Sequence, residues 1–180
     1  MSFDLLPLID ASNVEPFWKL IGDRKNAVEF RSQCESESFF WQHHHLTVRR
    51  FTGSRMMTKA ALMSEFDSVL QFREGGGNWD ALDDWLTYLG WLKPNAGYLF
   101  LITDAAQVLK DEPNERAVLI EVLRNAAPSW ASVVTEGAWR GRPAVPFHVV
   151  LADQSDSALE QAWGAGLPSI VNEPPVDEQM

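Results

Sequence analysis

The sequence predicts an α/β fold with a small parallel β-sheet of about three strands and helical crossovers packed on it. Three runs have strand character, at 46–51, 98–102 and 147–151, and segments with helical periodicity separate them. A strand followed by a helix and then by another strand favours parallel pairing with the helix against the sheet. With 180 residues, the chain can form one well-buried domain with extensions, whereas two full domains would be crowded.

The first strand and helix are predicted from two different periodicities. Residues 46–51, LTVRRF, alternate between apolar and polar side chains, as in a half-exposed strand. From Lys59 to Phe72, apolar residues recur at helical spacing: Leu62, Phe66 and Leu70. We therefore expect a strand that leads directly into a helix.

The later elements follow from continuous apolar runs and from helix boundary signals. Residues 98–102 form an apolar run that is typical of a strand covered on both faces, and 147–151 form another. Pro113, after two acidic residues, predicts the start of a helix, and Pro128 predicts its end. The apolar stripe of this helix is Val118, Leu119, Val122 and Leu123.

The chain divides into one core domain with two extensions. We expect an N-terminal extension, 1–45, that packs on the sheet through FWKLIG and AVEF, and a core domain at 46–153. The remainder, 154–180, is expected to end in a mobile acidic tail from residue 172, because its composition cannot bury much apolar area. The long connection 128–146 predicts a surface excursion or hairpin.

The segment Glu74–Leu86, EGGGNWDALDDWL, runs from three glycines into a helix with three aspartates. Asn78 can cap this helix, which then begins near Trp79. Asp80 and Asp84 lie one turn apart and should face water. The apolar face consists of Trp79, Leu82, Leu86 and Leu89.

Spacing alone favours a structural interpretation of these acids. Asp80 lies in the first turn, where the helix dipole stabilises a negative charge, and the other acids would solvate an exposed face. Two carboxylates on adjacent turns nevertheless repel each other, so a helix selected only for stability would more often pair Glu with Lys. The spacing of these aspartates is therefore also compatible with a role in binding.

Seven residues of this segment reproduce the barstar signature Gly-x-Asn-x-Asp-Ala-Leu-x-Asp-x-Leu: Gly76, Asn78, Asp80, Ala81, Leu82, Asp84 and Leu86. Residues 46–152 resemble the barstar family. The resemblance implies a barstar-like fold and an intracellular ribonuclease inhibitor, or immunity protein, rather than an enzyme. In that family, the glycine-led loop and the helix block the active site of a barnase-type ribonuclease, and the motif's two aspartates match Asp80 and Asp84.

The resemblance implies a basic secreted ribonuclease or nuclease toxin as partner, bound one to one. Asp84 is the first choice for the group that replaces phosphate, because charge-assisted bonds from carboxylate to Arg are strong. Trp85 is either an interface anchor or a core residue, and the sequence favours neither. The predicted partner-binding set is Gly76, Asn78, Asp80, Asp83, Asp84 and Trp85.

Two positions depart from the family pattern. Aromatic residues usually precede the glycine of the loop, whereas this chain has Glu74 and Gly75, which reduces the apolar contact area. The acidic contact on the later helix aligns with Asn125, beside Arg124, and is not carried over. We therefore expect a cognate enzyme that differs from barnase.

Composition limits the class of partner and compartment. The formal charge of −10 and the pI near 4.8 argue against a nucleic-acid surface and favour a basic protein partner. Cys34 is the only cysteine, the first ten residues lack a basic segment and a long apolar core, and no run approaches a membrane span. We expect a cytoplasmic protein without a cofactor or membrane contact.

Two other functions stay open. His43, His44 and His45, with Asp104 or Asp153, would suit a metal-dependent hydrolase, although side chains alternate along a strand and no zinc spacing is present. Histidines at a partly exposed strand entry are the more common case. The other alternative is a regulatory interaction module whose partner is not a nuclease.

Two weaker signals point to nucleotides or nucleic acid. The glycines before the helix could cradle a phosphate, but the adjacent aspartates would repel it. Trp139, Arg140 and Arg142 could stack on a single strand, yet an exposed loop whose arginines are solvated or paired with acids is favoured.

Overall fold

A computed structural model describes residues 2–36, 46–72, 77–89, 91–92, 97–137, 141–170 and 172–173. The strands of the described part are β1 (Ser2–Phe3), β2 (Phe17–Ile21), β3 (Thr47–Thr52), β4 (Tyr98–Thr103), β5 (Phe147–Asp153) and β6 (Asn172–Glu173). Its α-helices are α1 (Arg24–Glu35), α2 (Lys59–Leu70), α3 (Trp79–Tyr88), α4 (Arg116–Ala131) and α5 (Asp156–Trp163). Short 3-10 turns lie at Leu6–Leu8, Gly53–Arg55, Ala105–Gln107 and Pro113–Glu115.

The main sheet has four parallel strands in the order β2-β5-β4-β3. The predicted α/β class with a parallel sheet is confirmed, and β3, β4 and β5 are the three expected strands. The fourth strand, β2, comes from the FWKLIG segment, where Phe17 pairs with Val149 on β5. Its partner lies more than a hundred residues away, so local pattern alone did not identify it as a strand.

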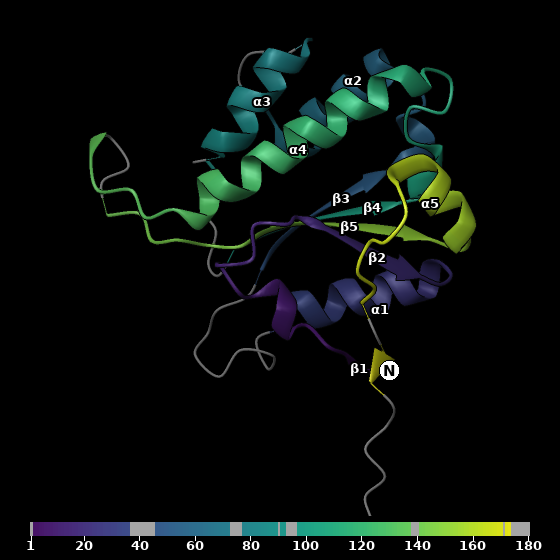
Figure 1. The fold of residues 1–180 in the computed structure, drawn as a ribbon, viewed down its shortest axis with the longest axis horizontal. Helices are drawn as coiled ribbons and strands as arrows, with labels where there is room; N and C mark the ends of the chain where they lie inside the picture. The colour runs from purple at the N-terminus through teal and green to yellow at the C-terminus, as the bar shows by residue number, and fades with distance from the viewer. Residues whose placement is uncertain are drawn as a thin grey trace, which may run out of the picture.

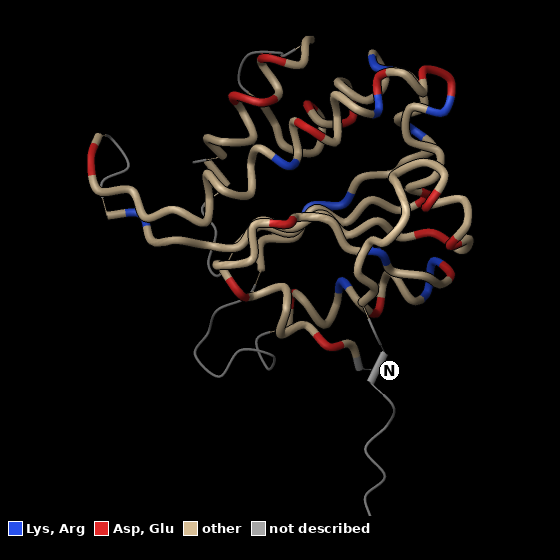
Figure 2. The backbone as a smooth tube through the Cα atoms, in the orientation of Figure 1, with Lys and Arg blue, Asp and Glu red and all other residues tan. Residues whose placement is uncertain are grey.

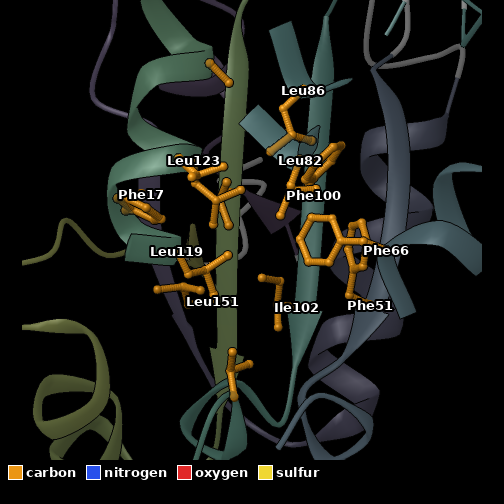
Figure 3. Packing of buried hydrophobic residues seen from close by; sticks show 14 of the residues in the cluster. Phe17, Phe51, Phe66, Leu82, Leu86, Phe100, Ile102, Leu119, Leu123 and Leu151 are labelled. Carbon is orange, nitrogen blue, oxygen red and sulfur yellow. The ribbon is translucent and has the colours of Figure 1, made fainter. Parts of the chain in front are cut away.

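The helices cover the two faces of the sheet unequally. Helices α2, α3 and α4 lie over one face and α1 lies under the other (Figure 1). The larger apolar cluster fills the first interface, where Phe51 packs against Phe66 and Phe100 with ring centroids 4.5 and 5.0 Å apart (Figure 3). Each fully buried phenylalanine stabilises the fold by about 1.5–3 kcal/mol relative to an exposed one.

The second cluster joins the N-terminal segment to the other face. Phe30 and Cys34 of α1 are fully buried against apolar residues of β4 and β5 such as Leu99 and Val150. The ring of Phe3 meets the ring of Phe30 edge to face at 5.4 Å. Burial also raises the pKa of the Cys34 thiol, so this cysteine is a neutral core residue.

His148 on β5 is a fully buried titratable side chain on the α1 side of the sheet. Its Nδ1 accepts a hydrogen bond from Nε1–H of Trp18 at 3.1 Å, and its Nε2 has no partner among the described residues. Burial lowers the pKa of His148 to about 4, because the charged imidazolium is poorly solvated there. The folded protein therefore holds a neutral imidazole at this position.

The predicted stop at Pro128 is wrong. Helix α4 continues through Pro128 to Ala131. A proline removes one intrahelical hydrogen bond, but Pro128 lies in the last turn of α4, and the packing of Trp130 holds this turn in place. Trp130 is 3% exposed, and its ring contacts Tyr98 at a centroid distance of 4.6 Å.

The expectation that Arg142 is solvated or paired with acids is also wrong. The connection after α4 forms a hairpin in which Val134 and Arg142 form an antiparallel bridge. The Arg142 guanidinium donates hydrogen bonds to the carbonyl oxygens of Ser129 at 2.8 Å and Ser132 at 3.2 Å, and lies 4.4 Å from the Trp130 ring. It therefore caps the carboxyl end of α4, where helix carbonyls lack intrahelical partners.

The tail predicted to be mobile from residue 172 begins differently, because Asn172 and Glu173 form β6 and pair antiparallel with β1. Other predictions concern residues outside the described part, among them the tail after residue 173 and the pair Trp139 and Arg140. None of the helices in the described part combines the length and hydropathy that crossing a membrane requires.

Candidate partner-binding site

Helix α3 begins directly after an asparagine cap. Oδ1 of Asn78 accepts a hydrogen bond from the N–H of Ala81 at 2.8 Å, and the helix begins at Trp79, as predicted. Asp80 lies in the first turn, where the positive end of the helix dipole favours a carboxylate. The cap fixes the start of α3 and thereby the direction of each later side chain.

The apolar face of α3 is anchored on the core, so the opposite face is open to solvent. Leu82, Leu86 and Leu89 are at most 1% exposed. The outward strip consists of four exposed residues: Asp80, Asp84, Thr87 and Tyr88. The water-facing position predicted for the two acids is confirmed.

Helix α3 itself carries no counter-charge to its outward acids. Residues 77–92 contain no Lys or Arg, and acidic segments mark the outer side of α3 without any basic segment on the helix (Figure 2). No ion pair involves Asp80 or Asp84 within the described part of the chain. Their mutual repulsion costs a few tenths of a kcal/mol, which the folded protein tolerates.

Asp83 differs from its two neighbours. It is half-buried, and its Oδ1 is shielded from solvent without a hydrogen-bond partner among the described residues. An unpaired buried carboxylate oxygen is costly, so this atom has capacity for a donor from a bound partner or from water. Asp83 borders the outward strip rather than belonging to it.

Trp85 lies in an aromatic cluster rather than in the main core. Its ring stacks on Phe72 with centroids 5.3 Å apart and meets Trp91 edge to face at 5.4 Å. The Nε1–H of Trp91 donates to the carbonyl oxygen of Leu70 at 2.7 Å. Trp85 is half-buried, so it joins α3 to the end of α2 and still presents part of its ring to solvent.

The carboxyl half of α3 is tied to the core by two hydrogen bonds. The Nε1–H of Trp130 donates to the carbonyl oxygen of Leu86 at 2.8 Å, and the Tyr98 hydroxyl donates to that of Leu89 at 3.1 Å. Both donors are buried, and both carbonyls lie in the last turn, where intrahelical donors are lacking.

The amino-terminal end of α3 is held by Trp79. The Nε1–H of Trp79 donates to Oε2 of Glu115 at 2.6 Å, and Nζ of Lys59 lies 3.7 Å from the same oxygen and 5.2 Å from the Trp79 ring centroid. The helix is thus attached near both ends, and its outward face has a fixed orientation.

A groove beside the carboxyl end of α3 was not predicted. A cavity of about 220 Å³ lies between Thr87 and Tyr88 on α3 and Val134 and Glu136 on the hairpin after α4. The hairpin residues lie about fifty positions from α3 in the chain, so spacing gave no signal for this contact. The sequence predicted only that residues 128–146 form a surface excursion or hairpin, and it did not predict that this segment lies beside α3.

The metal site is not supported in the described part of the chain. No group of three or more His, Cys, Asp or Glu side chains there could hold a metal ion, and His43–His45 lie outside it. Asp153 accepts hydrogen bonds from the N–H groups of Ala106 and Gln154, and Asp104 lies 3.6 Å from Nη2 of Arg24. Both acids thus have structural partners.

Of the predicted partner-binding residues, Gly76 lies outside the described part, together with Glu74 and Gly75. The structure brings Asp80 and Asp84 together on one exposed strip, with Asn78 at its start. The remaining two, Asp83 and Trp85, flank the strip as described above.

Comparison with known families assigns the domain that carries this helix. The family described as barstar (barnase inhibitor) matches residues 46–152, which include β3, α3, β4, α4 and nearly all of β5. The chain belongs to the barstar family. No curated protein and no solved structure matches the chain significantly.

Two regions fall outside the barstar match or depart from the barstar pattern. Strand β2 and helix α1 precede the matched range. On α4, Asn125 is exposed, while Arg124 pairs with Glu15 at 3.4 Å and lies 5.5 Å from the Phe17 ring. At the position where barstar resemblance implies an acidic contact, this chain therefore has a neutral residue beside a cation that the N-terminal segment holds.

Proposed function

We propose that this chain is an intracellular inhibitor, or immunity protein, of a basic secreted ribonuclease. One observation carries the proposal: Asp80 and Asp84 are exposed and lack an ion pair among the described residues, on a helix attached to the core near both ends. This helix lies in the range that matches the barnase inhibitor family.

Asp84 replaces a substrate phosphate in the enzyme's active site. A ribonuclease binds a phosphodiester through cationic side chains, and a carboxylate accepts the same charge-assisted, bidentate hydrogen bonds without offering a bond to cleave. Asp80 reinforces the negative field one turn away. Asn78 caps the helix, Gly76 precedes it in the sequence as part of the proposed contact, and Asp83 and Trp85 border the contact.

Rigid presentation and charge support tight, fast binding. A helix that is already ordered loses little conformational entropy when it docks, so more of the contact energy appears as affinity. An acidic strip opposite a basic cleft accelerates encounter, and this acceleration falls as salt screens the charges. We expect a one-to-one complex whose association rate decreases with ionic strength.

An inhibition assay tests the proposal. The chain is titrated against a panel of barnase-type ribonucleases, and the inhibition constant is measured for the wild type and for Asp84→Ala. The substitution leaves enzyme cations unpaired in the complex and should weaken inhibition by roughly 2–5 kcal/mol.

Asp111→Ala is the matched control, since Asp111 is an exposed aspartate outside α3. It removes the same charge and should leave the inhibition constant nearly unchanged. Equal inhibition constants for wild type and Asp84→Ala would reject the role of Asp84. Absence of inhibition by the wild type across the panel would favour a partner that is not a ribonuclease.

A further inference from the structure

A cavity of about 230 Å³ lies on the α1 side of the sheet, at the carboxyl ends of β3 and β4. Thr52 pairs with Thr103 in the parallel register, and Arg50 pairs with Leu101, so these four side chains form one wall. In parallel α/β sheets, ligands bind beyond the carboxyl ends of the strands.

The opposite wall comes from α1 and adds two more arginines. Arg24 and Arg31 line the cavity together with Arg50, against Asp104 as the acidic residue of the lining. Arg24 lies 3.6 Å from Asp104, and Arg31 lies 3.1 Å from Glu35. No ion pair involves Arg50 within the described ranges, so the cavity carries excess positive charge in a chain of net charge −10.

The position of Arg50 in its strand is informative. It alternates with Val48 and Thr52 on the face of β3 that α1 covers, and Val48 is buried in the apolar cluster there. A strand face beneath a helix is usually apolar. An arginine at this position stays solvated only because the cavity is open, and its fork of N–H donors suits a phosphate or carboxylate group.

Part of the cavity lining is apolar. It consists of Ala27 and Val28 of α1 and Leu101 of β4. A second hollow of about 190 Å³ shares Arg24, Ala27, Thr103 and Asp104 with the first, which extends the space along the sheet edge. The second hollow is also lined by Asp23 and Asp153, so an anionic group fits the first cavity and only an uncharged part fits the second.

We propose that this cavity binds a small organic phosphate, with the phosphate among Arg24, Arg31 and Arg50 and the carbon part over Ala27 and Val28. The excess charge of the lining matches a phosphate dianion, and the Thr52 hydroxyl supplies a further donor. The Thr103 hydroxyl instead donates to the carbonyl oxygen of Phe51 at 3.3 Å. The site is independent of ribonuclease inhibition, because α1 and α3 cover opposite faces of the sheet.

Titration calorimetry of the full chain at constant ionic strength tests this site with ribose 5-phosphate, inorganic phosphate and ribose as probes. We expect saturable binding of ribose 5-phosphate, weaker binding of inorganic phosphate, and no binding of ribose. Arg50→Gln should weaken ribose 5-phosphate binding about tenfold or more, the usual effect of losing a charge-assisted hydrogen bond.

Lys25→Gln is the matched control, because Lys25 lies on α1, is 81% exposed and does not line the cavity. Its affinity for ribose 5-phosphate should stay within about twofold of the wild type. Arg31→Gln provides a second test should Arg50→Gln fail to fold, with the same expected loss. Absence of saturation by ribose 5-phosphate, equal losses in Lys25→Gln and Arg50→Gln, or equal affinity for inorganic phosphate would overturn the proposal.

Discussion

On one side of the sheet, residues 77–92 carry three aspartates and no Lys or Arg. In contrast, residues 17–55, which include β2, α1 and β3, hold seven of the fifteen basic residues and only four acids. The net charge of −10 is therefore unevenly distributed. A total charge suggests the sign of a partner, but the local field decides which face meets it. The α3 face suits a cationic protein, and the α1 face suits an anion.

The largest expected effect tests whether the two faces form one cooperative unit. Phe30→Ala on the α1 side and Leu86→Ala on the α3 side each empty a site that is 0% exposed. Each should lower the free energy of unfolding by about 2–5 kcal/mol. Denaturant unfolding followed by tryptophan fluorescence and by circular dichroism should give one coincident transition for both variants.

Separate transitions for the two probes would show that the α1 side unfolds independently. A loss below about 1 kcal/mol for Phe30→Ala would show that α1 is only loosely attached.

The second largest effect is a pH dependence of stability that originates on the α1 side, where His148 is buried. Its pKa of about 4 in the folded protein is below the ordinary value of about 6.5, so the unfolded chain binds the proton first. Stability should therefore fall as the pH decreases from about 6.5 to about 4, by up to about 3 kcal/mol. Unfolding free energies measured across this range should show the decline.

His148→Gln is the control for that decline. The Gln amide oxygen can accept a hydrogen bond from Trp18, but it does not titrate. Parallel pH profiles for wild type and His148→Gln would contradict the assignment to this residue.

A smaller difference in stability is expected between variants of two arginines, Arg142 beside α4 and Arg50 on the α1 side of the sheet. Arg142→Gln removes hydrogen bonds to the end of α4 and the contact with the Trp130 ring, and should cost about 1–2 kcal/mol. Arg50→Gln removes no ion pair present among the described residues and should change stability by less than about 0.5 kcal/mol. Chemical denaturation of both variants measures the difference, and equal losses would contradict the comparison.

The smallest effect concerns the acidic strip in the free protein. Asp84→Asn relieves the repulsion from Asp80 and should raise stability by a few tenths of a kcal/mol, up to about 0.5. Thermal unfolding at low salt would detect this gain, and high salt should remove it. A loss of stability would mean that Asp84 has a structural partner.

The regular elements were predictable where their periodicity was strong. Continuous apolar runs identified β4 and β5, and Asn78 gave the start of α3 to the residue. Strand β2 could not be predicted in the same way, because it is a strand through its pairing with β5, and the local sequence pattern does not show this long-range pairing. The prediction that α4 ends at Pro128 failed because burial of Trp130 offsets the hydrogen bond that the proline removes, and this burial depends on tertiary packing.

The candidate site was predictable only in part. Spacing placed Asp80 and Asp84 on the exposed face, and the family signature supplied their proposed role. The partial burial of Asp83 and the stacking of Trp85 on Phe72 depend on neighbouring elements, so the sequence left them open. Arg50 and Arg31 line the same cavity only because α1 packs against β3, and no sequence motif predicts that contact.

NMR of the isotope-labelled chain tests whether the α3 face contacts the proposed ribonuclease partner. On addition of an unlabelled ribonuclease that the chain inhibits, we expect shifted or broadened amide signals for Asp80–Tyr88, while those of Arg24–Glu35 stay unchanged. Perturbation confined to Arg24–Glu35, with the α3 signals unchanged, would contradict this expectation.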